Sequence, residues 1–168
     1  MARKKSRLPG GAALDLEHRI SYRFSVISSM VVRAVASIYG PKYGLLPPSW
    51  KTMAAIRRYG PMSAKDVCVH TTVEPDKVTR AVDRLVALRY VQRTKDELDR
   101  RRVVLLLTPA GRKVYDDIEG STRRVELLLL DALSTQEREA LDRITTKLQG
   151  QADRHIGKNR NRTSVLKM

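Results

Sequence analysis

The segment from Glu74 to Thr108 limits the possible folds more strongly than any other part of this sequence. After Pro75, which suits the first turn of a helix, apolar side chains recur at helical spacing: Val78, Val82, Leu85 and Leu88. Cations recur on another face of the same predicted helix: Lys77, Arg80 and Arg84. Residues 90–94 and 102–107 are predicted to form two strands joined by polar residues 95–101. A cationic helix followed by a basic hairpin is typical of a winged helix that grips DNA.

Two interpretations of these cations compete. A run of charge on a helix usually means only that the face is solvated. The predicted turn favours the alternative, because three consecutive arginines, Arg100 to Arg102, repel one another unless an anion is near. Asp99 can neutralise one of them, and a phosphate backbone could neutralise the others. The hairpin therefore favours contact with nucleic acid.

Three stretches resemble the MarR family of ligand-responsive transcription regulators. Asp99-Arg100-Arg101, followed by Val104, Leu106-Leu107-Thr108 and Ala110-Gly111-Arg112, resembles the wing signature of that family. Asp76 to Arg80 with Asp83 to Leu85 resembles its recognition helix, and residues 44–50 resemble the start of its second helix. The resemblance covers roughly residues 16–153. The sequence departs from the family pattern at three positions: Leu46 replaces a frequent capping Thr, and Thr72 and Arg89 replace common glycines.

The resemblance implies a mainly α (α+β) fold, a winged helix-turn-helix with long N- and C-terminal helices that form a dimerisation domain. It implies a homodimer that binds an inverted repeat in double-stranded DNA, as a repressor released by a small molecule. Lys77 and Arg80 would enter the major groove beside Thr79, and Arg84 would meet phosphate. Asp99 would orient an arginine, while Arg100 or Arg101 would reach the minor groove or its phosphates. The predicted DNA-binding set is Asp76, Lys77, Thr79, Arg80, Arg84, Asp99, Arg100 and Arg101.

A small-molecule pocket between the dimer helices and the DNA-binding lobe is also implied by the resemblance. Its candidate lining residues are Arg23, Met30, Arg33, Trp50 and Met53. The two arginines could hold a carboxylate and Trp50 could stack on an aromatic ring, so a phenolic acid or its thioester is the expected effector. The alternative is that Trp50 belongs to the core and that the arginines are solvated or paired.

The charge balance agrees with a nucleic-acid partner. The 168 residues carry a net charge of +15 with a pI near 10.4, which favours nucleic acid or an anionic membrane surface. Nine of these charges lie near the chain ends, at Arg3, Lys4, Lys5, Arg7, Arg154, Lys158, Arg160, Arg162 and Lys167. Apolar runs are far shorter than the ~20 residues that span a bilayer. We expect no membrane partner, no signal peptide and a cytoplasmic location.

The chain is predicted to consist of a disordered basic arm (1–13), a helical dimerisation region (14–45 and 109–153), a winged helix-turn-helix domain (46–108) and a disordered basic tail (154–168). The first helix is expected to end at Gly40-Pro41 and carries a nearly heptad apolar stripe: Leu16, Ile20, Phe24, Ile27, Val31, Val35 and Ile38. The last two helices, the first of which is expected to end at Leu133, add Leu127 to Leu130 and a stripe of Leu141, Ile144 and Leu148. Capping boxes are predicted where Ser63 stands three residues before Asp66 and where Ser134 stands three residues before Glu137. A dimer interface is favoured, and a three-helix bundle within one chain is the alternative.

Motifs for catalysis or metal binding are absent from the sequence. The three histidines are scattered, and the single Cys68 is interpreted as buried and inert rather than as a redox sensor. We therefore expect no enzyme, no cofactor and no metal site. A sequence-indifferent architectural nucleic-acid-binding protein is the alternative function, and an RNA-binding protein is a more distant one. The ratio of affinities for palindromic and random duplex distinguishes the first two.

Overall fold

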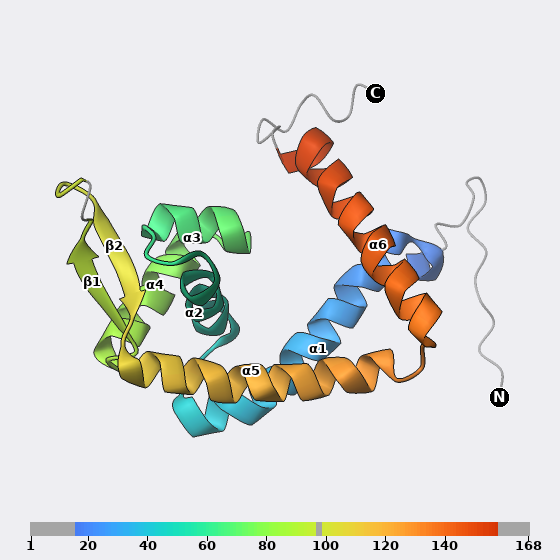
Figure 1. Ribbon diagram of the computed structural model, residues 1–168, viewed down its shortest axis with the longest axis horizontal. Coiled ribbons are helices and arrows are strands. Elements are labelled where there is room, and N and C mark those ends of the chain that lie inside the picture. The colour runs from blue at the N-terminus through green and yellow to red at the C-terminus, as the bar shows by residue number, and fades with distance from the viewer. Residues whose placement is uncertain (1–15, 97–98, 158–168) are drawn as a thin grey trace, which may run out of the picture. The chain divides into compact units, whose positions relative to one another are not determined.

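The computed structural model describes residues 16–96 and 99–157, so the predicted arm at 1–13 and the part of the tail from 158 onward lie outside the described residues. The chain divides into two compact units, which meet between Thr122 and Arg123 in the sequence. Figure 1 shows the elements, which in chain order are η1 (Leu16–His18), α1 (Ile20–Tyr43), α2 (Pro47–Tyr59), α3 (Ala64–Thr71), α4 (Pro75–Ala87), β1 (Val91–Lys95), β2 (Val103–Leu107), α5 (Pro109–Leu130), α6 (Thr135–Ala152) and η2 (Asp153–Gly157).

Local side-chain chemistry sets several helix starts as the sequence predicts. Ser63 accepts a bond from the Asp66 N–H, and the Asp66 carboxylate accepts from the Ser63 N–H, which forms a capping box at α3. Ser134 and Glu137 make the same box at α6. At α5 the Thr108 hydroxyl accepts from the Gly111 N–H at 3.0 Å. These bonds satisfy N–H groups that the first helical turn leaves without partners.

Several predicted boundaries were wrong by one to a few residues. Helix α1 does not end at Gly40-Pro41 but continues through Pro41 to Tyr43. A proline this close to the C-terminus removes only one internal hydrogen bond, and Gly44 then ends the helix with φ 63° and donates its N–H to the Gly40 carbonyl. Strand β1 lies one residue later than predicted, at 91–95. Helix α5 ends at Leu130 rather than at Leu133, because residues 131–133 form a turn.

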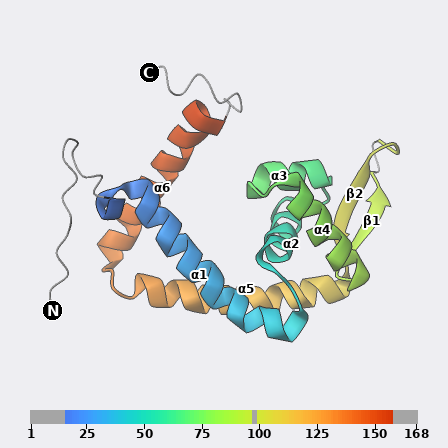
Figure 2. The ribbon, with the colours of Figure 1, turned by 180° about the vertical axis from the view of Figure 1, so that it is seen from behind.

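The core of the first unit lies where α2, α3 and α4 meet (Figure 2). The apolar stripe predicted for α4 forms this core, since Val78, Val82 and Leu85 are all buried. The antiparallel hairpin pairs Val91 with Leu107 and Lys95 with Val103, and a bridge between Met62 and Leu105 ties β2 to the segment before α3 (Figure 1). Burial of this stripe stabilises the unit because each fully buried aliphatic side chain contributes about 1.5–3 kcal/mol.

Two of the departures from the family pattern have a visible backbone cost. Thr72 and Arg89 both have positive φ, 54° and 59°, at helix ends where a glycine would fit without strain. Each costs roughly 1 kcal/mol relative to glycine. The mainly α winged fold forms nevertheless, because the surrounding core and hairpin hold both residues in place.

Gly111 satisfies the tightest steric requirement of the first unit. A Cβ placed on Gly111 would lie 1.9 Å from the backbone oxygen of Tyr90, a contact that no side chain could make without moving the main chain. The same Tyr90 oxygen accepts the Thr108 N–H at 3.0 Å. The close approach of α5 to the turn between α4 and β1 therefore depends on the absence of a side chain at this position.

Helix α1 leaves most of its apolar surface exposed. Val35 and Tyr39 are buried, and burial raises the pKa of the Tyr39 phenol to about 12, while Ile27 is 42% exposed and Met30 is 59% exposed. By length and composition alone this helix would also allow a bilayer crossing, and only 11% of the tested stretch is buried. Arg23 lies within the same helix, and an arginine is costly to transfer into hydrocarbon. We interpret α1 as an amphipathic helix whose apolar face lacks a cover.

The second unit leaves its apolar residues exposed in the same way. Helix α6 contains no buried residue, and Leu141, Ile144 and Leu148 are all at least 38% exposed. The end of α5 exposes Leu128 to 77%. Contiguous apolar faces of this extent are rare on monomeric proteins and usually mark an interaction surface.

Candidate nucleic-acid interface

Helix α4 separates its apolar and cationic residues as its sequence predicts. Its buried face packs against α2 and α3, and all five predicted DNA-binding residues of this helix lie on the exposed side: Asp76, Lys77, Thr79, Arg80 and Arg84. Pro75 begins the helix and Glu74 precedes it in an extended conformation. The cations are therefore held on a rigid element whose orientation is set by a well-packed core.

The exposed cations of α4 differ in their partners. Lys77 forms an ion pair with Glu74 at 2.9 Å, and this lysine lowers the pKa of the Glu74 carboxyl. Both side chains are well exposed, so solvent screens the pair and its contribution to stability is small. Among the described residues, Arg80 and Arg84 have no carboxylate within ion-pair distance. Arg80 and Arg84 are thus available to an external anion. Lys77 would have to break its ion pair with Glu74 before it could bind one.

The Thr79 hydroxyl is already engaged within the helix. It donates a hydrogen bond to the Pro75 carbonyl one turn earlier, at 3.0 Å. A contact between this hydroxyl and a base edge would use its oxygen as an acceptor or require a different rotamer.

Asp99 shapes the turn of the wing. Its carboxylate accepts a hydrogen bond from the Arg101 backbone N–H at 3.0 Å, and its backbone oxygen accepts from the Arg102 N–H at 2.9 Å. The sequence predicts that Asp99 orients or neutralises an arginine side chain, and the bonds found here join Asp99 to the backbone of the turn. Arg100 and Arg101 are exposed beside it.

Arg102 is neutralised by Asp66, a residue that the sequence predicts only as part of a helix cap. The guanidinium of Arg102 donates to the Asp66 carboxylate, which also accepts from the Ser63 N–H and hydroxyl. The Ser63 hydroxyl, ahead of the Arg102 charge, lowers the pKa of the Asp66 carboxyl. This contact spans 36 positions in the sequence, so no local pattern could reveal it. All three arginines are exposed, but Arg100 and Arg101 have no carboxylate within ion-pair distance among the described residues.

Arg84 lies against the loop that precedes α2. A Cβ on Gly44 would lie 2.8 Å from a terminal nitrogen of Arg84, so the guanidinium covers the backbone of that glycine. Together with Lys77 and Arg80, Arg84 borders a hollow of about 490 Å³ whose other wall includes Leu46 and Pro48. The sequence predicts that Arg84 contacts phosphate, and no local sequence pattern indicates this hollow.

The five predicted ligand residues are not brought together in one place. Arg23, Met30 and Arg33 lie on the exposed side of α1, and Met53 is fully buried in the core, where it contributes to packing. Trp50 stacks on Tyr115 with a ring-centroid distance of 5.1 Å and lies 6.3 Å from the Tyr39 ring. Of the two interpretations of Trp50, the structure supports a partly buried aromatic cluster whose edge borders open space.

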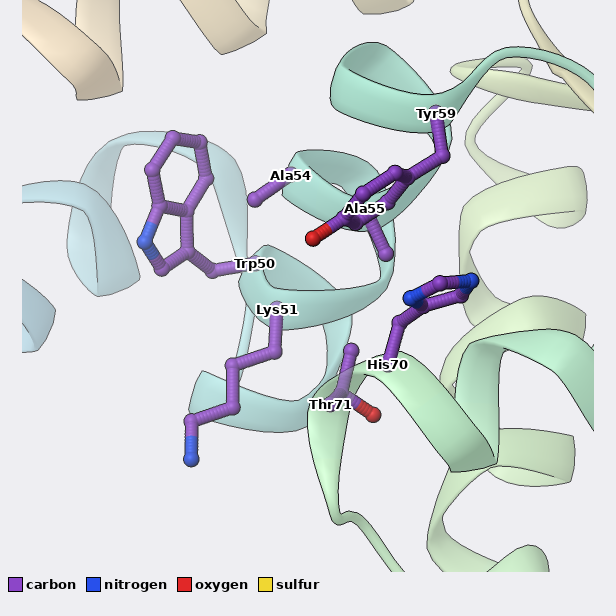
Figure 3. A pocket seen from close by; sticks show the side chains of 7 residues that line it. All are labelled: Trp50, Lys51, Ala54, Ala55, Tyr59, His70 and Thr71. Atoms are coloured by element: carbon purple, nitrogen blue, oxygen red, sulfur yellow. The ribbon is translucent and has the colours of Figure 1, made fainter. Parts of the chain in front are cut away.

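Two hollows lie beside Trp50. A small one of about 80 Å³ is bordered by Val35, Tyr39 and Trp50 from α1 and α2. A larger one of about 340 Å³ lies between α2 and α3, where Tyr59 stacks on His70 at 4.0 Å and Lys51 stands at the rim (Figure 3). Groups of three or more His, Cys, Asp or Glu side chains that could hold a metal were not found among the described residues.

Comparison with known proteins places this geometry in a family. The MarR family model matches residues 43–102, which span α2, α3, α4 and the wing. The transcriptional regulator YwoH of Bacillus subtilis, itself uncharacterized, is 30% identical over 102 residues, which are 61% of this chain and 74% of that protein. The chain belongs to the MarR family. It is therefore a DNA-binding transcription regulator, and its relatives are regulators rather than enzymes.

A second MarR-type relative matches a shorter part of the chain. The HTH-type transcriptional repressor NicR of Pseudomonas putida is 32% identical over 90 residues, which cover 54% of this chain and 57% of NicR. The match therefore covers little more than half of NicR.

Solved structures of MarR-type regulators share the fold. CouR of Rhodococcus jostii, bound to p-coumaroyl-CoA, has a TM-score of 0.72 at 23% identity and covers 83% of this chain and 96% of its own. A mutant of Escherichia coli MarR, complexed with operator DNA, has a TM-score of 0.69 at 18% identity, and the match covers 82% of this chain and 99% of that one. BpsR of Bordetella bronchiseptica, whose DNA binding is regulated by 6-hydroxynicotinic acid, has a TM-score of 0.69 at 21% identity. The match covers 83% of this chain and 98% of BpsR. At these identities the likeness concerns the fold alone.

Proposed function

We propose that two copies of this MarR-family chain bind an inverted-repeat operator as a cytoplasmic repressor that a small acidic effector releases. The observation that carries the DNA-binding part is the exposed pair Arg80 and Arg84 on α4, both without a carboxylate partner among the described residues. NicR, a relative, is a repressor, and the MarR mutant has been solved with operator DNA.

In this proposal helix α4 and the wing contact different parts of the DNA. Lys77, Thr79 and Arg80 lie near the start of α4, so their side chains reach base edges in the major groove beside Asp76. Arg84, farther along the helix, contacts phosphate. Arg100 and Arg101 in the wing contact the minor groove or its phosphates, on a turn that Asp99 shapes.

The homodimer is proposed because each unit has an apolar face that it leaves exposed. Ile27 on α1 and Leu128 at the end of α5 represent these faces. A second copy offers the same faces by symmetry, which is the commonest way in which soluble proteins cover such surfaces. Two-fold symmetry then places the half-sites of the operator about one helical turn, ~10 bp, or a multiple of it apart.

The effector is proposed to be an aromatic carboxylate or its thioester. CouR binds p-coumaroyl-CoA and BpsR responds to 6-hydroxynicotinic acid, and both ligands contain an aromatic ring and an acyl or carboxylate group. In this chain the Trp50 cluster borders a hollow of about 340 Å³ that has Lys51 at its rim. Ring stacking on Trp50 and charge pairing with Lys51 would suit such a molecule. The other predicted ligand residues on α1 are exposed, and they would contact the effector from that side: Arg23, Met30 and Arg33.

The deciding experiment compares specific and non-specific DNA binding. Sites selected from a random duplex pool should contain a dyad, and Arg80→Ala should weaken the selected site by about 1–3 kcal/mol while affecting random duplex little. Lys147→Ala, which removes an exposed cation from α6, is the matched control and should change neither affinity. Equal affinity of the wild type for selected and random duplex would instead identify a sequence-indifferent architectural protein.

A further inference from the structure

Two carboxylates stand on the exposed side of helix α4, and their surroundings differ. Asp83 forms an ion pair with Arg93 of β1 at 2.5 Å. Asp76, near the start of the same helix, has no cation within ion-pair distance among the described residues. The cation next to it in the sequence, Lys77, is paired with Glu74 instead. Asp76 therefore keeps an unneutralised negative charge on the helix that is the proposed DNA contact.

Asp76 and Arg80 carry opposite charges on one face of α4 and do not pair with each other. Opposite charges four residues apart are neighbours on a helix surface, where they often form an ion pair. Among the residues that the structure describes, these two side chains are not within ion-pair distance, and both are exposed. The carboxylate and the guanidinium are thus both available to an outside partner.

A free carboxylate on a DNA-binding helix acts against most of the DNA surface. It is repelled by the phosphates, and it is also repelled by the acceptor atoms that guanine and thymine present in the major groove. Cytosine presents an amino group at N4 and no acceptor, so it is the base edge that suits a carboxylate best. Adenine presents its amino group beside the acceptor N7, so it suits a carboxylate less well. Such a residue gains specificity at a cost in general affinity.

A purely structural role for Asp76 is the competing explanation. An aspartate in the first turn of a helix is stabilised by the helix dipole, whatever the helix binds. Glu74, at the N-cap position of α4, already supplies a carboxylate at this helix start. The Thr79 hydroxyl is engaged with the Pro75 carbonyl, and Lys77 is engaged with Glu74. The groups near the start of α4 that remain free to read bases are therefore Asp76 and Arg80.

We propose that Asp76 determines specificity by selecting a cytosine in each half-site of the operator, where its carboxylate accepts a hydrogen bond from the N4 amino group. Arg80 reads a nearby guanine through O6 and N7. The inference rests on the proposed function and deepens it by naming the bases. Four residues span about 6 Å along a helix axis, so the cytosine lies within about two base-pair steps of ~3.4 Å from the guanine.

The test is a binding-site selection from random duplex with the full-length wild type and with two variants. Wild-type sites should contain the cytosine, and changing this C·G pair to T·A should weaken binding about 5- to 150-fold. Asp76→Asn should change the preference at this position from cytosine to adenine, because an amide pairs with N6 and N7 of adenine. Asp76→Ala should discriminate less than twofold at this position. It should bind random duplex at least as tightly as the wild type, because it has lost a charge that phosphates repel.

Two further variants separate the role of this carboxylate from a general effect of charge. Asp76→Glu keeps a carboxylate and should keep the preference for cytosine. Asp83→Asn removes the other exposed carboxylate of α4, which is paired with Arg93, and should also leave that preference unchanged. Urea denaturation of each variant measures whether the fold is retained.

The outcomes distinguish this inference from the proposed function. Preference for cytosine in both Asp76→Asn and Asp76→Ala would overturn the inference alone. A loss of affinity in Asp76→Ala that is equal on selected and random duplex would also overturn it, because a role confined to the helix start gives that result. Equal affinity of the wild type for selected and random duplex would instead overturn the proposed function, and this inference with it.

Discussion

The winged-helix core and the terminal helices use the same kind of apolar stripe with opposite results. On α4 the stripe is buried within the chain, and Val78 and Leu85 have no exposed surface. On α6 no residue is buried, and α1 buries only Val35 and Tyr39. The comparison teaches that an amphipathic pattern specifies a face to be covered but does not specify what covers it. The winged-helix core buries its stripe within the chain, whereas the terminal helices leave most of theirs exposed.

The largest expected effect tests whether the winged-helix unit depends on close packing within the chain. Gly111→Ala places a Cβ against the Tyr90 carbonyl and should lower the free energy of unfolding by about 3 kcal/mol. Gly150→Ala is the matched control on α6, where a Cβ would meet only the tip of Arg154, at 3.9 Å, outside the local helix backbone. That variant should be stabilised by roughly 0.5–1 kcal/mol, because alanine favours helix more than glycine does. Urea denaturation measures the free energy of unfolding of both variants. Equal changes in Gly111→Ala and Gly150→Ala would contradict the contrast between the two regions.

The next effect tests whether the exposed stripes are an interface. Ile27→Asp and Leu128→Asp should each raise the dimer dissociation constant about 10- to 150-fold, since each removes roughly 1.5–3 kcal/mol of apolar burial between copies. Val69→Asp replaces an apolar residue of α3 that is 62% exposed, and it should leave the assembly unchanged. Sedimentation equilibrium gives the constants. If the wild type were a monomer at micromolar concentration, α1 and α6 would need a cover from within the chain, as in the three-helix alternative.

A smaller effect separates wing arginines that the sequence presents as equivalent. Arg101→Ala should lower the slope of log affinity against log salt by about one, as expected for one lost phosphate contact. Arg102→Ala should change the slope less, because Asp66 already neutralises this guanidinium. Binding to random duplex at several salt concentrations measures both slopes. Equal slopes for the two variants would mean that the Asp66 pair opens when DNA binds.

The smallest expected effect compares the two capping boxes through their pH dependence. The pKa values of Asp66 and Glu137 are both lowered, chiefly by bonds from Ser63 and Ser134 respectively. A lowered folded-state pKa means that the stabilisation is complete above the ordinary value, 3.8 for Asp66, and is lost as pH falls below it. The urea concentration at the unfolding midpoint should therefore decrease as the pH is lowered from about 5 to about 2.5. Asp66→Asn should flatten this decline more than Glu137→Gln, since Asp66 also holds Arg102; a larger effect of Glu137→Gln would contradict this.

The order of the winged-helix elements and their local chemistry could be predicted from the residues alone. The spacing of Val78, Val82 and Leu85 predicted the buried face of α4, and both serine capping boxes were confirmed. These features depend on residues within one or two helical turns, so a linear pattern contains the necessary information. The family assignment rested on the wing and recognition-helix residues and was also confirmed.

Contacts between groups that are far apart in the chain could not be predicted in this way. Asp66 pairs with Arg102, and Arg84 covers Gly44, although each pair is far apart in the sequence. Such contacts arise from packing of whole elements, and the sequence offers many cations and carboxylates that could pair equally well. The same reason explains the end of α1, where Gly44 in a left-handed conformation, rather than Pro41, stops the helix. Local pattern therefore specifies the elements, while the contacts that tune the charges of the interface depend on how those elements pack.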